Sequence, residues 1–368
     1  MSAIFQRPLC DMGPAYDHAF RPRVGEPDPA SGGPCDDRPH RVELYSASAR
    51  PSAECTDWRT FSLCPEHEAQ LARYDTRLAS QIVASWFRTP RPAVVPRVRL
   101  NQGAEMPTLG LGVFQAPAGT ATRDAIAWAF EAGYRHIDTA AMYGNEADVG
   151  AAVRSSGLPR EEVFVTTKLW HTDHGIESAQ AAARKSLERL GLSYIDLYLI
   201  HWPRAKVPAD RLDSWRALEK LQREGLCRSI GVSNYTVHHL EELAAHAGVV
   251  PAVDQVEFHP FVYNPELLAY CERHGIRLEA WAPLARGRYF DHPTVRAIAQ
   301  SHARTPPQVL LRWGLEHGVI EIPKSVHRER IIENAKVFDF VLDPSEVASL
   351  DALRGGARVG LWDPADIP

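Results

Sequence analysis

Residues 195–203 read IDLYLIHWP, an apolar run that stops at a histidine. A short apolar run of this kind is typical of a strand buried on both faces of a parallel sheet. His201 at its end is either a core histidine that bonds to a backbone carbonyl or part of a functional site. Structural polar groups outnumber catalytic ones, so this strand alone favours the first interpretation. The ends of the neighbouring strands decide between the two.

Seven more segments of the same type occur in the chain. The eight predicted strands lie at 110–114, 135–140, 163–169, 195–201, 228–234, 252–258, 277–284 and 318–325. Helical segments separate them, and one of these, at 177–190, carries an apolar face and is followed by Gly191. Eight strand-then-helix units within about 270 residues predict an α/β fold, the (β/α)8 TIM barrel.

A doubly wound sheet is the alternative fold. The segment GLGVFQAP at 110–117 has two of the glycines, but it lacks the third glycine of a dinucleotide fingerprint and the acidic residue that follows it. We therefore expect the barrel. Ahead of the first strand, VRLNQGAEMPTL at 98–109 predicts an N-terminal β-hairpin with Gln102 and Gly103 at its turn.

Composition excludes several classes of protein. The 368 residues are 45% hydrophobic, enough for a sizeable core, and the net charge of −5 without Lys/Arg runs gives no footprint for nucleic acid or an anionic membrane. The start has no signal-peptide pattern and no segment approaches the roughly 20 apolar residues of a membrane span. Six cysteines in a chain of this length do not form a disulfide framework. We expect a cytoplasmic protein.

The first 95 residues differ in sequence pattern from residues 96–368, so we expect an N-terminal extension followed by one barrel domain. Pro/Gly punctuation such as RPRVGEPDPASGGP predicts a loop-rich extension, poorly ordered or a small accessory unit. A strand at 42–48 and an amphipathic helix at 66–87 are its predicted regular elements. We expect the chain from Val94 onward to fold and to act without it.

Three interpretations of the extension remain open. Cys35, Cys64 and His67 could hold zinc with Cys10 or Cys55 as the fourth ligand, but only Cys64 and His67 have the close spacing that zinc sites use. A poorly ordered tail with incidental cysteines is favoured over zinc. The segment could also be untranslated: no methionine lies between Met12 and Met106, so a later start would need a valine codon at Val94 or Val95.

Polar side chains collect where the predicted strands end. They are Asp138 with Tyr143 in the following loop, Lys168, His201, Ser233, Asn234, Gln255, Trp281, Lys324 and Ser325. Active sites of (β/α)8 barrels are built at the C-terminal ends of the strands. A separate structural explanation for every position is improbable, so His201 is interpreted as one member of a site.

The residue types at these ends suit proton donation to an oxygen. A tyrosine hydroxyl has a pKa of about 10, and a neighbouring lysine ammonium favours the phenolate, so we expect Lys168 to lower the pKa of Tyr143. Asp138 would pair with Lys168 and keep it charged. His201 could hydrogen-bond a substrate oxygen and orient a carbonyl toward the phenol. The sequence shows no metal cluster at these positions.

The motifs HIDTAAMYGNE, FVTTKLW, YLIHWP, IGVSN, DQVEFHP, WAPL and IPKSVHRERIIENAKVFDF, which follow GLGVF in this order, resemble an aldo-keto reductase. The resemblance runs from about Val95 to the C-terminus, and it is strongest to the bacterial branch that contains the 2,5-diketogluconate reductases. It implies NADPH as hydride donor at the barrel mouth and a hairpin that caps the opposite face. Its catalytic four match Asp138, Tyr143, Lys168 and His201.

The resemblance also implies a cofactor groove. The matching positions are Val113, Phe114, Asp138, Ser233, Asn234, Gln255, Trp281, Pro283, Leu284, Lys324, Ser325, Val326, Arg330, Glu333 and Asn334. Of these, Ser233, Asn234 and Gln255 match the residues that bind the nicotinamide amide. Trp281 replaces the tyrosine that many members stack on the ring, although stacking needs only a flat aromatic face. Lys324, Ser325 and Arg330 match the 2′-phosphate site, while Glu333 and Asn334 match adenine contacts.

The substrate side is implied less fully. Phe114 stands where many relatives have tryptophan, and the expected pocket residues are Phe114, Tyr143, Trp170, His201 and Trp202, with His171 beside them. These aromatic residues could instead belong to the core. The short segment ARGRYFDHP after the seventh strand predicts an open pocket for small ketones, aldehydes or keto-sugars. We expect a monomeric carbonyl reductase; the alternative is a regulatory barrel that binds NADPH with little turnover, against which the intact catalytic four argue.

Overall fold

The computed structural model describes residues 95–205, 207–360 and 362–368, together with six short strands in the first 63 residues. Contacts within the chain divide it into two units, residues 1–91 and residues 92–368. Each unit is described separately below. None of the described helices is long and apolar enough to cross a membrane.

The described part of the first unit consists of short antiparallel strands. They are β1 (Ser2–Ile4), β2 (Gln6–Pro8), β3 (Phe20–Gly25), β4 (His40–Val42), β5 (Leu44–Ser46) and β6 (Trp58–Leu63), arranged in the orders β1-β3-β5 and β2-β6-β4. Strands β4 and β5 overlap the strand predicted at 42–48. The helix predicted at 66–87 and the zinc candidates Cys10, Cys35, Cys55, Cys64 and His67 lie outside the described residues.

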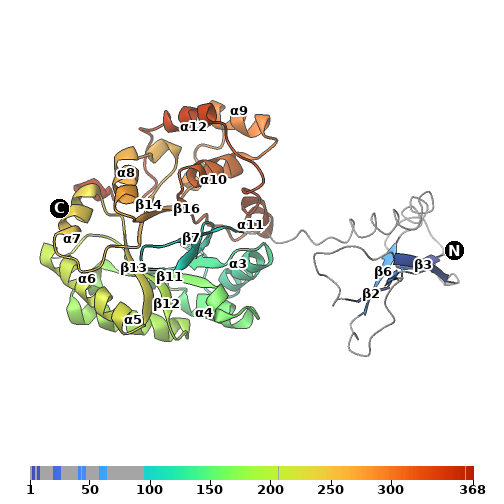
Figure 1. Ribbon diagram of the computed structural model, residues 1–368, viewed down its shortest axis with the longest axis horizontal. Helices are drawn as coiled ribbons and strands as arrows, with labels where there is room; N and C mark the ends of the chain where they lie inside the picture. The colour runs from blue at the N-terminus through green and yellow to red at the C-terminus, as the bar shows by residue number, and fades with distance from the viewer. Residues whose placement is uncertain are drawn as a thin grey trace. The chain divides into compact units, whose positions relative to one another are not determined.

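The second unit is built on a parallel sheet of eight strands in sequential order (Figure 1). They are β9 (Leu111–Gly112), β10 (His136–Asp138), β11 (Phe164–Leu169), β12 (Ile195–Ile200), β13 (Cys227–Ser233), β14 (Val253–Glu257), β15 (Arg277–Trp281) and β16 (Ile320–Glu321). Parallel bridges pair Leu109 with Glu321 and Gly112 with Lys324, so the two edge strands meet. Each predicted strand overlaps one of the eight, which confirms the α/β fold.

Ten described helices accompany the sheet (Figure 1). They are α3 (Thr120–Glu131), α4 (Glu146–Ser155), α5 (Ile176–Leu190), α6 (Pro208–Arg223), α7 (Val237–Ala244), α8 (Pro265–Arg273), α9 (Pro293–Ser301), α10 (Pro306–Glu316), α11 (Arg328–Asn334) and α12 (Pro344–Asp351). Proline begins α8, α9, α10 and α12, where its fixed φ suits the first turn and its missing N–H costs nothing. The predicted stop after α5 is present, since Gly191 adopts a left-handed conformation with φ of 61°.

Two apolar clusters hold this unit together. The larger one lies between the sheet and the helices, and it includes the apolar face of α5 (Ala179, Ala183, Leu187 and Leu190). The smaller one lies inside the sheet and includes Phe164, Leu197, Leu199, Val253 and Ile320. Gly231 on the neighbouring strand makes room for it, because an added Cβ would stand 2.8 Å from Leu199 Cδ2.

The predicted hairpin completes the inner cluster. Strands β7 (Arg97–Arg99) and β8 (Glu105–Pro107) pair in antiparallel register, and the buried side chains of Leu100 and Met106 pack onto the inner cluster. The side chain of Gln102 at the turn accepts a hydrogen bond from the Ile230 backbone N–H at 3.0 Å. Because Phe164 and Val253 are the first residues of their strands, the hairpin covers the N-terminal end of the barrel interior.

Candidate active site

The structure brings the four expected catalytic side chains together at the opposite end of the strands. Asp138 is the last residue of β10, and Tyr143 ends the short 3-10 helix η2 (Ala141–Tyr143) that follows it. Lys168 is the last residue but one of β11, and His201 comes directly after β12. Gly144, with φ of 72°, ends η2 in a left-handed conformation that glycine adopts without strain.

Lys168 is the centre of this group. Its Nζ donates hydrogen bonds to Asp138 Oδ1 at 2.6 Å, to the Thr139 carbonyl at 2.9 Å and to the Tyr143 hydroxyl at 3.3 Å. An ammonium group has three hydrogens, and these three acceptors use all of them. The Tyr143 hydroxyl oxygen therefore acts as an acceptor toward Lys168, and its own hydrogen points elsewhere.

Burial and charge together keep Lys168 protonated. Burial alone would lower the pKa of Lys168, but attraction to Asp138 and then to Tyr143 raises it above its usual value. Burial also raises the pKa of Asp138, and the ammonium of Lys168 and the Gln255 amide offset part of that rise. The expected pairing of Asp138 with Lys168 is present as a buried ion pair. Such a pair resists the loss of either partner, because one buried charge would be left uncompensated.

The expected fall in the pKa of Tyr143 is wrong in its net direction. Burial raises the pKa of Tyr143 to about 12, and the attraction of Lys168 offsets only part of the rise. The charge of Lys168 favours the phenolate, but the cost of burying a second charged group at this strand end is larger. The consequence for chemistry is that Tyr143 holds its proton at neutral pH, as a proton donor must.

His201 lies between Tyr143 and an aromatic wall. Its ring centroid is 5.7 Å from that of Tyr143 and 5.1 Å from that of Trp170. Burial, followed by the positive charges of Lys168 and His171, lowers the pKa of His201 well below the usual range. The imidazole is therefore neutral, and its Nδ1 has no hydrogen-bond partner in the described part of the chain. A neutral histidine can donate one N–H to an oxygen without adding charge.

The candidates for binding the nicotinamide amide form a network beside the catalytic four. Ser233 donates to the Gln255 carbonyl at 2.7 Å, and Trp281 Nε1 donates to Asn234 Oδ1 at 2.9 Å. Asn234 also donates to the His201 carbonyl at 2.9 Å and has a φ of 63°. A non-glycine residue in the left-handed region stores strain of roughly 1–3 kcal/mol, which such networks hold in place.

The candidates for the adenosine end of a dinucleotide lie on the loop that follows β16 and on α11. Lys324 and Arg330 are exposed, and neither has an ion-pair partner among the residues that the structure describes. Ser325 Oγ accepts from the His327 N–H at 3.1 Å, and Glu333 accepts from the Thr305 hydroxyl at 2.6 Å. Asn334 is buried, and Val326 is half-buried against the outer core.

The remaining expected groove positions flank the mouth. Val113 is buried after β9, Phe114 is exposed beside it, and Pro283 and Leu284 follow β15 in a buried and a half-buried position. The Phe114 ring centroid is 4.9 Å from that of Tyr143. Phe114 thus lies next to the expected proton donor, as either a substrate or a cofactor contact requires.

Sequence reasoning missed Trp362 in the aromatic wall. Trp362 stacks on Trp170 with centroids 6.2 Å apart, meets Trp202 edge-on at 5.1 Å and lies near His171 at 5.7 Å. The Arg204 guanidinium covers another part of the Trp362 ring at 4.7 Å. The only sign of this role in the sequence was a lone tryptophan in the tail LWDPADIP. Which residues it contacts depends on the path of the tail. Trp202 itself is 7% exposed, so most of its ring is covered by neighbouring residues.

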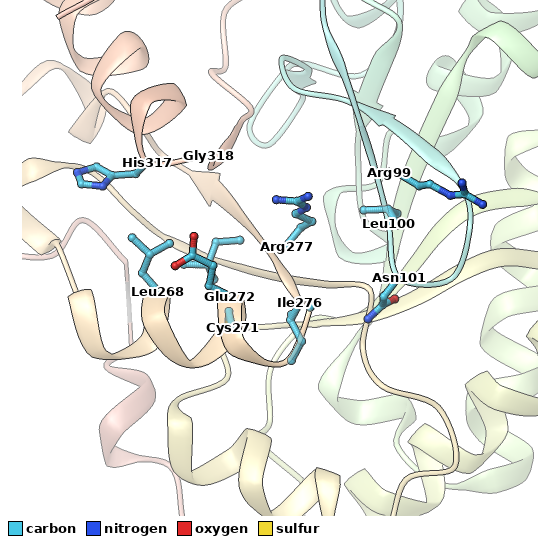
Figure 2. Close-up of a pocket in the computed structure, with 12 residues that line it drawn as sticks. Arg99, Leu100, Asn101, Leu268, Cys271, Glu272, Ile276, Arg277, His317 and Gly318 are labelled. Carbon is cyan, nitrogen blue, oxygen red and sulfur yellow. The ribbon is translucent and has the colours of Figure 1, made fainter.

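A hollow lies at the other end of the barrel. It has a volume of about 480 Å³ and is lined by residues of the hairpin, the end of α8 and the start of β15, including Asn101, Cys271 and Arg277 (Figure 2). None of the sequence-predicted site residues lines it. The candidate active site therefore lies at the C-terminal ends of the strands and does not include this cavity.

Comparison with known proteins agrees with this geometry. The model of the aldo/keto reductase family matches residues 108–354. A glyoxal reductase of Bacillus subtilis is 51% identical over 264 residues, which cover 72% of this chain and 94% of the relative. An aldo/keto reductase crystal structure from Brucella melitensis has a TM-score of 0.68 at 45% identity, over 70% of this chain and 99% of that one.

A third relative carries a cofactor. The Bombyx mori aldo-keto reductase solved in complex with NADP has a TM-score of 0.69 at 37% identity, and the match covers 74% of this chain and 98% of that one. The family match extends over both the strands that form the sheet and the residues gathered at their C-terminal ends. The chain belongs to the aldo/keto reductase family.

Proposed function

We propose that this protein is an NADPH-dependent reductase of small carbonyl compounds, with Tyr143 as the proton donor. The observation that carries the proposal is the set of three hydrogen bonds from Lys168 to Asp138, Thr139 and Tyr143. Because these bonds use every hydrogen of the ammonium, the phenol is held by its oxygen and keeps its proton for another acceptor. A site arranged in this way suits the protonation of a substrate oxygen that gains negative charge.

The residues present fit a phosphorylated dinucleotide. Gln255 Oε1 receives no hydrogen bond from the described residues, so it is free to accept one from a carboxamide. Two cations without ion-pair partners in the described chain, Lys324 and Arg330, suit a dianionic 2′-phosphate. The flat indole of Trp281 is held by Asn234 and could stack on a ring. The Bombyx mori relative was solved in complex with NADP, which supports this choice of cofactor.

The proposed mechanism assigns one task to each residue. NADPH supplies the hydride that reaches the carbonyl carbon. His201, neutral at physiological pH, donates an N–H to the carbonyl oxygen and orients it. Tyr143 transfers its proton to that oxygen as negative charge develops there, so the products are an alcohol and NADP⁺. Lys168 stabilises the phenolate that remains, and Asp138 holds Lys168 in place.

The proposed substrates are small α-dicarbonyls and aldehydes, with keto-sugars as a wider class. The Bacillus subtilis relative that shares 51% identity is a glyoxal reductase. The wall of Trp170, Trp202 and Trp362 offers flat apolar faces, and Phe114 lies on the side of Tyr143. His201 and Tyr143 lie beside this wall, and the Arg204 guanidinium covers part of Trp362, so a compact carbonyl compound suits it.

The test is consumption of NADPH, followed by its absorbance, with glyoxal, methylglyoxal, aromatic aldehydes and keto-sugars. We expect turnover with at least one dicarbonyl, and lower kcat/KM with NADH than with NADPH. Tight NADPH binding without turnover on any member of the panel would reject the proposal and favour a regulatory barrel. Absence of NADPH binding would reject the cofactor assignment as well.

A further inference from the structure

Gln255 lies between two buried carboxyl groups. Its Nε2 donates to Asp138 Oδ2 at 2.8 Å and to Glu279 Oε2 at 2.7 Å. An amide nitrogen has two hydrogens, and the two carboxyl groups use both. Gln255 and Glu279 are register partners on β14 and β15, and neither side chain is more than 1% exposed.

This arrangement determines which way round the amide lies. The reverse orientation would direct the amide oxygen at the carboxylate of Asp138, which is paired with Lys168, and both buried carboxyl groups would lose a donor. The nitrogen must therefore face Asp138 and Glu279. The oxygen of Gln255 then points away from this pair, where no described residue donates to it.

The surroundings of Glu279 show that it can accept the hydrogen bond from Gln255 without carrying a full negative charge. His136 Nε2 on β10 stands 3.6 Å from Glu279 Oε1, which has no hydrogen-bond partner among the described residues. Burial and then the negative charge of Asp138 raise the pKa of Glu279 to about 8, while Gln255 and Lys168 act in the opposite direction. Buried Glu321 on β16 also feels the charge of Glu279. A neutral acceptor of similar shape should therefore replace Glu279.

We propose that Glu279 is a positioning residue that fixes the Gln255 amide, with its nitrogen toward Asp138 and its oxygen free to accept from the carboxamide of the nicotinamide ring. The inference rests on the proposed function, because it requires NADPH at the barrel mouth. Asp138 then serves two partners with its two oxygens, Lys168 through Oδ1 and Gln255 through Oδ2. Glu279 itself touches neither substrate nor cofactor.

Two substitutions separate positioning from simple packing. Glu279→Leu keeps the volume but removes the acceptor, and Glu279→Gln keeps an acceptor oxygen for Gln255 without the charge. The readouts are the dissociation constants for NADPH and for adenosine 2′,5′-bisphosphate, which carries the 2′-phosphate but no nicotinamide. Thermal unfolding of each variant reports stability.

We expect Glu279→Leu to weaken NADPH by about twofold to twelvefold, the equivalent of one neutral hydrogen bond of roughly 0.5–1.5 kcal/mol. Affinity for adenosine 2′,5′-bisphosphate should stay at the wild-type value, and Glu279→Gln should match wild type for both ligands. In a Gln255→Leu background, Glu279→Leu should have no further effect on NADPH. If Glu279→Leu fails to fold, Glu279→Ser is measured in its place.

Equal weakening of both ligands, additive losses in the double variant, or a Glu279→Gln variant as weak as Glu279→Leu would overturn the inference. So would a Glu279→Leu variant, or its serine substitute, that binds NADPH like wild type. The proposed function fails by a different result, namely a wild-type protein that does not bind or consume NADPH.

Discussion

The two ends of the barrel interior are built from the same strands but differ in every physical respect. The N-terminal end holds an apolar cluster that Leu100 and Met106 of the hairpin close. The C-terminal end holds a buried ion pair, a phenol and a neutral imidazole. Strand β11 illustrates the change, since it begins with Phe164 in the apolar cluster and carries Lys168 four residues later. We infer that one end supplies stability and the other supplies chemistry.

The difference also explains how the polar end is tolerated. A buried lysine, carboxylate and amide would each cost several kcal/mol if left without partners. Here Asp138 accepts hydrogen bonds from both Lys168 and Gln255, and Gln255 also donates to Glu279 on β15. The apolar end meets no such requirement, and its contribution grows with the area that it buries. Substitutions at the two ends should therefore fail in different ways.

The largest effect is expected for Lys168→Met, which should lower both turnover and stability. Turnover should fall by at least about a hundredfold, since acid–base assistance is worth about 10² to 10⁴. Unfolding free energy should also fall by about 3–5 kcal/mol, because Asp138 is left buried without its counter-charge. Steady-state kinetics and urea unfolding measure the two. Adding Asp138→Asn should restore much of the stability but no turnover; a double variant as unstable as the single would refute the ion-pair explanation.

At the apolar end, Met106→Ala should cost stability alone. Met106 on the hairpin is fully buried against the inner cluster, and truncation of such a residue typically costs about 2–5 kcal/mol. The kcat of the folded variant should equal that of wild type. The matched control is Met142→Ala, because Met142 is 42% exposed and its truncation should change stability by no more than about 0.5 kcal/mol. A Met106→Ala variant that stays stable but loses kcat would break the division between the two ends.

The cofactor assignment at the polar end is sharpened by Lys324→Ala and Arg330→Ala. Each should weaken NADPH by about 1.5–3 kcal/mol, the value of a charge-assisted contact, and leave NADH almost unchanged. Arg328→Ala is the control, since Arg328 lies on α11 with Arg330 but pairs with Glu131 at 3.2 Å. Titration of each variant with both cofactors measures the effect. A loss of NADH affinity as large as that of NADPH would contradict a 2′-phosphate site.

A smaller effect concerns pH. Burial and Asp138 raise the pKa of Glu279 to about 8, above its value of about 4.3 in an unfolded chain. The folded protein therefore holds a proton that the unfolded chain releases, so this stability is fully present below pH of about 4.3 and is lost as pH rises through about 8. Glu279→Gln removes the titration, so its melting temperature should gain on that of wild type across this range. A constant difference between the two would contradict the shifted pKa.

Much of this organisation could be predicted from sequence, because the period of the apolar residues and the position of the polar residues indicate it. Apolar runs that end in Asp138, Lys168 or His201 indicate both a parallel barrel and the end at which its site lies. The net pKa shift of Tyr143 could not be predicted, since it depends on how deeply the phenol lies among its neighbours. Trp362 was missed because the path of a tail has no periodic signal, and Glu279 was missed because its role depends on the orientation of another side chain.

The central claim is that Tyr143 donates a proton at the polar end, and the single-turnover rate of Tyr143→Phe tests it most directly. The variant, saturated with NADPH, is mixed with methylglyoxal, and the loss of NADPH absorbance is followed in one turnover. We predict unchanged NADPH affinity, an unchanged melting temperature and a rate lower by about 10² to 10⁴, because the cofactor groove is intact and only the proton donor is missing. A rate close to that of wild type would contradict the account.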